Sequence, residues 1–294
     1  MQKAEKQDRL ATGLILGLAG IAALIVISLV AYLLITGLPH VSWHFLTSSA
    51  ASFTSGGGIF DQLFNSFYLV VLTLAVAVPL ALGAAIYLSE YAPQNGWTNA
   101  LRLAIEVLSS LPSIVIGLFG YLVFVLRWGL DFSLLAGALA LTIINLPLLT
   151  RACETALQQV PALQRQAGLG LGMPKWQVTL KIVLPQALPG ILTGEILSAG
   201  RIFGEAAALI YTAGQSTVNV DYTNWNPFAP TSFLNPMRPA ETLAVHIWKV
   251  NTEGLIPDAA AVSSGAAAVL ILTILIFNLS ARGLGNYLAR RLRK

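Results

Sequence analysis

The most restrictive feature of the sequence is a run of 27 residues, 10–36, that contains no charged side chain. About 20 apolar residues suffice to cross a bilayer. The run follows Lys3, Lys6 and Arg9, as in a secretory signal peptide. It is far longer than the roughly 7–15 residues of a signal's apolar region, and no small-x-small cleavage site follows. We therefore expect a retained membrane span.

Further apolar runs continue along the chain, which is 56% hydrophobic and only 10% charged. Soluble globular proteins are nearer to about 45–50% apolar and about 25% charged. This composition excludes a soluble enzyme, a disordered chain and a coiled coil, and the single cysteine, Cys153, excludes an intrachain disulfide framework. We predict an all-α membrane protein with six transmembrane helices over 10–36, 67–88, 103–126, 133–149, 190–213 and 259–279. A helix break is expected at 109–113 (SSLPS), inside the third span.

Lysine and arginine residues are distributed unequally between the two sides of the predicted bundle. If the N-terminus is cytoplasmic, the inner segments hold thirteen of the 17 basic residues and the outer segments hold three. This bias predicts that both termini are cytoplasmic. The domain plan is then a cytoplasmic tail at 1–9, a membrane domain at 10–280 and a basic cytoplasmic tail at 281–294. The membrane domain carries an inner loop at 150–189 and an outer loop at 214–258, with room for a short helix near 240–249.

The inner loop contains a patterned stretch, 161–190, that is too polar to span the membrane and too apolar for a free loop. We predict a helix through Leu171, a turn at 172–174 and a second helix from Pro174, since glycine favours the end of a helix and proline the start of the next. The apolar side chains of this hairpin need a groove on another protein or a layer of lipid headgroups.

The spacing in this hairpin resembles the cytoplasmic signature of ABC importer permeases, which reads E-A-A, three residues, G, nine residues, I-x-L-P. The matching residues are Gln166, Ala167, Gly168, Gly172, Ile182, Leu184 and Pro185. The chain departs from the signature at Gln166, where glutamate is usual, and at Gly168, where alanine is usual. The resemblance implies that these residues couple the chain to an ATPase.

Other segments narrow the resemblance to the PstA-type permease of the phosphate ABC importer. They are 56–59 (GGGI), 111–119 (LPSIVIGLF), 151–154 (RACE), 201–207 (RIFGEAA) and 235–239 (NPMRP). The resemblance implies a MetI-like permease fold in a bacterial or archaeal inner membrane. It also implies three kinds of partner besides membrane lipid: a second, PstC-type permease, two PstB-type ATP-binding subunits and an external PstS-type phosphate-binding protein.

Ionisable residues within the predicted spans are candidates for the substrate pathway, because charged groups are costly in the bilayer. The fifth span holds Glu195, Arg201 and Glu205. Arg201 and Glu205 are four residues apart, which predicts that they share one face of a helix and point into the bundle. Either Arg201 lines an anion pathway or the two residues form a neutralising pair that fixes helix packing. Arg151 and Glu154 are a second candidate pair, at the cytoplasmic mouth.

No motif in the sequence predicts catalysis, a cofactor, a metal site or nucleic-acid binding. The glycines at 168, 170 and 172 lack the pattern of a nucleotide-binding P-loop, so ATP hydrolysis must occur on a partner. His40 and His44 have the spacing of a metal pair but no nearby third ligand. The alternatives to a phosphate importer are a permease for another oxyanion, such as sulfate or molybdate, and a secondary transporter, which would need no ATPase.

Overall fold

The structure is a computed structural model that describes residues 2–51, 54–216, 218–254 and 256–292, and these are almost entirely helical. Met1, Arg293 and Lys294 of the predicted tails lie outside the described residues. In chain order the helices are α1 (Gln2–Gly37), η1 (Leu38–His40), α2 (Trp43–Thr47), α3 (Phe60–Ile86), η2 (Tyr87–Tyr91), α4 (Gly96–Ser109), α5 (Ser113–Gly120), η3 (Tyr121–Arg127), α6 (Leu134–Gln158), α7 (Ala162–Gly170), α8 (Lys175–Val178), η4 (Thr179–Val183), α9 (Leu184–Gly204), α10 (Ala207–Ile210), α11 (Leu243–Glu253) and α12 (Ala259–Leu292).

The predicted six spans correspond to five long apolar helices and one bent pair among the described residues. The bent pair is α4 with α5 and η3, which meet at an angle of 95°. The break falls at Ser110, Leu111 and Pro112, where the sequence predicted it. Proline disfavours helical backbone in the residue before it, which ends α4 there. The described parts of the predicted tails are not separate segments, since α1 begins at Gln2 and α12 continues to Leu292.

The fifth predicted span, 190–213, is wrong at both ends. The helix starts earlier, because α8, η4 and α9 form one continuous stretch, Lys175–Gly204. It also ends earlier, at Gly204, where Glu205 adopts an extended conformation and the chain turns into the short helix α10. Apolar composition after Gly204 suggested a longer span, but those residues are buried against α5 and α6 instead.

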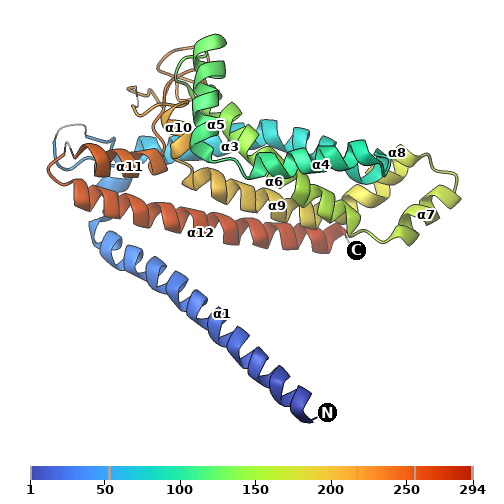
Figure 1. The fold of residues 1–294 in the computed structure, drawn as a ribbon. Coiled ribbons are helices and arrows are strands. Elements are labelled where there is room, and N and C mark those ends of the chain that lie inside the picture. Colours follow the sequence, from blue (N-terminus) through green and yellow to red (C-terminus); the bar gives the residue numbers. More distant parts are fainter. Residues whose placement is uncertain (1, 52–53, 217, 255, 293–294) are drawn as a thin grey trace.

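Helices α3, α6, α9 and α12 lie roughly side by side, with α6 packed against α3, α5 and α9, and α12 packed against α9 and α1 (Figure 1). The apolar stretch of α1 is exposed in the isolated chain, and α1 meets α12 at its C-terminal end while its N-terminal part points away from the bundle (Figure 1). A Cβ atom on Gly37 would lie only 2.2 Å from the carbonyl oxygen of Ser264, so only glycine permits this crossing.

The bundle has two distinct ends. The hairpin end carries α7, α8 and η2, and both the start of α1 and the end of α12 lie on the same side (Figure 1). The loop end carries α10, α11 and the long connection at 211–242. The short helix predicted near 240–249 is confirmed as α11.

Candidate coupling hairpin and transport pathway

The turn of the α7–α8 hairpin is closed by a Schellman motif at the end of α7. The Gly172 N–H donates to the Leu169 carbonyl at 2.9 Å, and the Met173 N–H donates to the Gly168 carbonyl at 3.2 Å. Gly172 has a φ of +79°, in the left-handed region that glycine adopts most readily. Pro174 precedes α8 as its N-cap, one residue outside the helix start predicted from the sequence.

The predicted coupling residues divide into two groups. Gln166, Ala167 and Gly172 are exposed on the outer side of the hairpin. Gly168 is buried where α7 crosses the following helix, and Ile182, Leu184 and Pro185 are half-buried inside the continuous stretch that leads into α9. A Cβ atom on Gly168 would lie 2.7 Å from Cδ1 of Ile182, so a side chain at this position would require Ile182 to shift.

Large apolar side chains remain exposed on the hairpin. Its exposed apolar residues are Leu163, Leu169, Leu171, Trp176 and Leu180, with Leu171 the most exposed at 82%. Several large exposed apolar side chains on one short hairpin are typical of a protein or membrane contact.

The hairpin is attached to the bundle by Arg165 of α7. Its Nε and one terminal nitrogen donate to the Glu90 carboxylate of η2, the closest pair of atoms being 2.8 Å apart. The guanidinium also donates to the carbonyls of Leu157 and Val160 at the end of α6. These bonds fix the guanidinium to the chain where α6 ends.

A second charged cluster lies at the same end and contains the predicted Arg151–Glu154 pair, whose closest atoms are 3.5 Å apart. The buried Glu154 carboxylate has a better partner in Arg102 of α4, at 2.9 Å. Arg102 also donates to the Leu88 carbonyl of η2 at 3.1 Å. Arg151 is half-exposed and lies 3.7 Å from Glu106. The cluster therefore joins α4, α6 and η2.

Arg201 and Glu205 do not share a helix face, which corrects the prediction made from their spacing. Arg201 lies in the last turn of α9 and is exposed, on a stripe of α9 that also presents Thr193 and Leu197. Glu205 follows the helix end, and its carboxylate accepts a hydrogen bond from the Ala208 N–H of α10 at 3.4 Å. Arg201 forms no ion pair with any residue that the structure describes.

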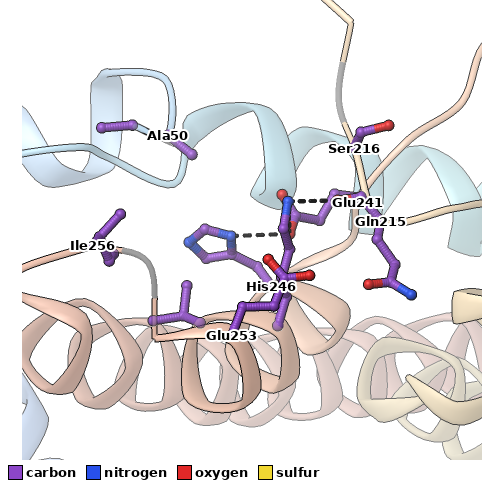
Figure 2. Close-up of a pocket in the computed structure, with 10 residues that line it drawn as sticks. Ala50, Gln215, Ser216, Glu241, His246, Glu253 and Ile256 are labelled. Carbon is purple, nitrogen blue, oxygen red and sulfur yellow. Dashed lines mark hydrogen bonds and ion pairs between the residues drawn. The ribbon is translucent and has the colours of Figure 1, made fainter. Parts of the chain in front are cut away.

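A pocket of about 380 Å³ opens at the loop end, between the connection at 211–242 and α11 (Figure 2). Its polar wall is formed by Glu241, His246 and Lys249. The Glu241 carboxylate lies 3.2 Å from Nδ1 of His246 and 3.8 Å from Nζ of Lys249. Glu241 and His246 are both almost fully buried, and Figure 2 shows the contact between them.

Beside this pocket a buried arginine, Arg238, is held within the fold. It donates to Oδ1 of Asn65 at 2.7 Å. Burial lowers the pKa of its guanidinium, an effect that the charges of Tyr222, Tyr68 and Asp61 oppose. Tyr222 donates to the Asp61 carboxylate at 2.6 Å, and burial, that hydrogen bond and the Asp61 charge together raise the pKa of Tyr222.

Comparison with known proteins identifies the family. The model of the family described as "Binding-protein-dependent transport system inner membrane component" matches residues 77–294. The chain belongs to this family of ABC transporter permeases. The permease is 49% identical over 285 residues to the probable ABC transporter permease protein YqgI of Bacillus subtilis, with 97% of each chain covered. It is 36% identical over 256 residues to the phosphate transport system permease protein PstA 2 of Mycobacterium bovis, covering 86% of the permease and 79% of that protein.

Solved structures confirm the MetI-like fold. A bacterial alginate ABC transporter, solved in complex with an alginate pentasaccharide-bound periplasmic protein, aligns with a TM-score of 0.67 over 98% of both chains, at 13% identity. The inward-facing MetNI methionine ABC transporter aligns with a TM-score of 0.57 over 79% of the permease and 94% of that chain, at 16% identity. Family membership decides against the secondary-transporter alternative.

Sequence reasoning missed Glu90, Arg102 and Arg165, which lie at the centre of the hairpin-end clusters. Each is separated from its partner by more than 50 residues, 75 in the case of Arg165 and Glu90. No local spacing rule links such residues, although the position of Arg165 directly before the signature in the permease places it on the hairpin.

Proposed function

We propose that the chain is the PstA-type subunit of an ATP-driven importer that moves inorganic phosphate into the cytoplasm. It would work with a PstC-type permease, two PstB-type ATPase subunits and a PstS-type binding protein. The sequence relationship to PstA permeases supports phosphate, although the YqgI relative carries no substrate in its name. Sulfate or molybdate remains the alternative cargo.

The observation that carries the proposal is the exposed Arg201 at the end of a membrane span. An arginine in a span needs a counter-charge or a polar cavity, because the bilayer does not solvate it. Its planar guanidinium stays charged and presents several N–H donors suited to phosphate oxygens. The stripe of α9 around Arg201 would face the second permease, so that the substrate pathway lies between the two subunits. Glu205, beside it in the chain, would limit how tightly the anion binds.

The exposed apolar hairpin would dock on an ATPase subunit. ATP binding would bring the two ATPases together and carry the hairpins with them, which switches the spans from inward-facing to outward-facing. Phosphate would then enter from the binding protein and leave on the inner side after hydrolysis. The Arg151–Glu154 pair would lie near the inner gate.

Uptake of radiolabelled phosphate tests the role of Arg201. Arg201→Gln should insert and retain the ATPase but lose uptake, and Arg201→Lys should recover only part, because lysine lacks the bidentate fork. Arg127→Gln, an exposed arginine outside the α9 stripe, is the matched control and should transport normally. Parental uptake by Arg201→Gln would make Arg201 a packing residue. Competition by sulfate or molybdate in the parent would favour the alternative cargo.

Docking of the hairpin is tested by a matched pair of glycine substitutions. Gly172→Ala places a side chain at a positive φ, which costs about 1–2 kcal/mol and should weaken ATPase binding by about five- to thirty-fold. Gly170→Ala lies in helical backbone with open space around it and should bind the ATPase normally. Equal ATPase binding by both variants would show that the hairpin is not the docking element.

We also propose that both termini and the hairpin are cytoplasmic, as the basic residues and the common side of α1 and α12 in Figure 1 suggest. Phe228→Cys, 89% exposed at the loop end, should react with an impermeant maleimide in intact cells, whereas Lys175→Cys should not. The reverse pattern would overturn this orientation. The parent is the control, since Cys153 is buried.

A further inference from the structure

Both arms of the α7–α8 hairpin contact η2, the short helix that continues α3 at the end of its span. Arg165 of α7 pairs with Glu90, and Nζ of Lys175 at the start of α8 lies 5.0 Å from the ring centroid of Tyr91. The chain passes through α4, α5 and α6 between η2 and the hairpin. Side chains, not chain connectivity, therefore join α3 to the hairpin.

The Glu90–Arg165 contact is the stronger of these two links. The Glu90 side chain is only 7% exposed, and Arg165 is also fixed by the carbonyls of Leu157 and Val160. A buried carboxylate that loses its cation is strongly destabilised. Displacement of α7 must therefore carry η2 with it or break this pair.

The opposite end of α3 is hydrogen-bonded to the wall of the loop-end pocket. Gln62 donates to the Glu241 carboxylate at 2.9 Å, and Asn65 donates to the Glu241 main-chain carbonyl at 3.0 Å. Ser66 accepts from the Leu243 N–H at 2.9 Å. Glu241 in turn contacts His246 in the pocket (Figure 2). The 32 residues of α3 and η2 thus connect the hairpin to the pocket over about 48 Å.

We propose that Glu90 is a positioning residue that transmits movement of the hairpin along α3 to the Glu241 pocket. This inference rests on the proposed docking of an ATPase on the hairpin. An ATP-driven displacement of α7 moves η2 through Arg165, and α3 carries the displacement to Glu241. The route is separate from the covalent one, in which α8 and η4 continue directly into α9. Since coupling between binding sites is reciprocal, contact of a binding protein at the pocket changes the affinity for ATP through the same helix.

The test follows the pocket while the other end of α3 is altered. Ser216→Cys, exposed at the pocket rim, is introduced into the complete importer with its ATPase in lipid nanodiscs, and its rate of maleimide labelling is measured with and without ATP. We expect ATP to change the rate by about tenfold, within the usual range of allosteric coupling. Glu90→Gln should reduce this change to less than about threefold while ATP hydrolysis continues, and Glu90→Asp should restore part of it.

Glu106→Gln is the matched control, because Glu106 pairs with Arg151 at the same end but is 66% exposed. It should respond as the parent does. A parental response in Glu90→Gln would overturn the proposal. Loss of the bound ATPase in Glu90→Gln would also overturn it, because Glu90 would then be a structural anchor.

A second variant tests the route at the far end of α3. Gln62→Leu removes the hydrogen bond to Glu241 and should abolish the response at Ser216→Cys without affecting ATP hydrolysis. A parental response would assign the route to α9 instead. The labelling rate does not depend on which ion is transported. If the parent shows ATP-dependent labelling but takes up no phosphate, the assignment of phosphate as the substrate is refuted and this inference is unaffected. A parent that binds no ATPase would refute the proposed function itself.

Discussion

The two ends of the permease hold their charged side chains in different ways. At the loop end, Arg238, Glu241 and His246 are each less than 5% exposed. At the hairpin end the carboxylates of Glu154 and Glu90 are buried, but the arginines that pair with them stay partly exposed, 22% for Arg165 and 28% for Arg102. The loop-end cluster is thus enclosed by its own chain, whereas the hairpin-end arginines keep part of their surface exposed. Loss of a charge should therefore damage stability at the loop end and coupling at the hairpin end.

The largest loss of stability is expected from Arg238→Gln. The substitution removes the guanidinium that donates to Asn65 and that balances Asp61 within a nearly solvent-free cluster. Breaking such a buried arrangement costs about 3–5 kcal/mol. Thermal unfolding of the purified protein in lipid should show a markedly lower Tm. Arg127→Gln, at an exposed site, is the control, and an equal Tm for the two variants would contradict the burial argument.

The same substitution at the hairpin end, Arg102→Gln, should cost less, about 1.5–3 kcal/mol. It removes the hydrogen bonds to Glu154 and to the Leu88 carbonyl, but Arg151 and Gln158 still contact the Glu154 carboxylate. The measurement is the same thermal unfolding, with Arg238→Gln beside it. If Arg102→Gln proved the more destabilising of the two, the contrast between the ends would be reversed.

A smaller effect, about 1–2 kcal/mol, is expected from Tyr222→Phe, which removes the hydrogen bond to Asp61. The raised pKa of Tyr222 adds a dependence on pH. The folded state keeps the phenol protonated after the unfolded chain has lost its proton near pH 10, so this contribution is complete below that pH and declines above it. The parent should lose stability above about pH 10 more steeply than Tyr222→Phe.

The smallest change is expected from Gly168→Ala, which restores the alanine of the permease signature. The new methyl group would lie 2.7 Å from Cδ1 of Ile182 and 2.9 Å from Cγ2 of Val178, and both side chains must shift to admit it. The gain in helix propensity, about 1 kcal/mol, opposes this overpacking. We expect a change of less than about 1 kcal/mol in stability and unaltered ATPase binding. A large loss of ATPase binding would show that the α7 crossing requires glycine.

Local sequence patterns, which involve only residues close together in the chain, allowed much of this architecture to be predicted. Uncharged runs gave the number of spans, Pro112 and its serine neighbours predicted the broken third span, and Gly172 predicted the hairpin turn. Each of these features depends on local backbone chemistry or on hydropathy, which a single chain displays directly. The pairing of Arg151 with Glu154 was predictable for the same reason, because residues three apart on a helix are neighbours.

The same local rule failed for Arg201 and Glu205. Spacing predicts a shared face only if the helix continues, and α9 ends at Gly204. The apolar residues that follow are buried against α5 and α6, so hydropathy described their burial correctly but not their conformation. Close packing of α10 on α5 depends on Gly117, whose Cβ would lie 2.7 Å from Cα of Ala208, and such a contact between distant segments is not visible in the sequence.

The amino-acid sequence alone was enough to predict a membrane permease with a cytoplasmic-signature hairpin, because length, hydropathy and motif spacing are properties of contiguous residues. Only the tertiary structure decided which charges meet. Glu90 pairs with Arg165, Glu154 pairs with Arg102 and Gln62 donates to Glu241, across separations of 52 to 179 residues. Burial at these sites permits a carboxylate only where a donor faces it, and the folded arrangement of helices alone brings the two together.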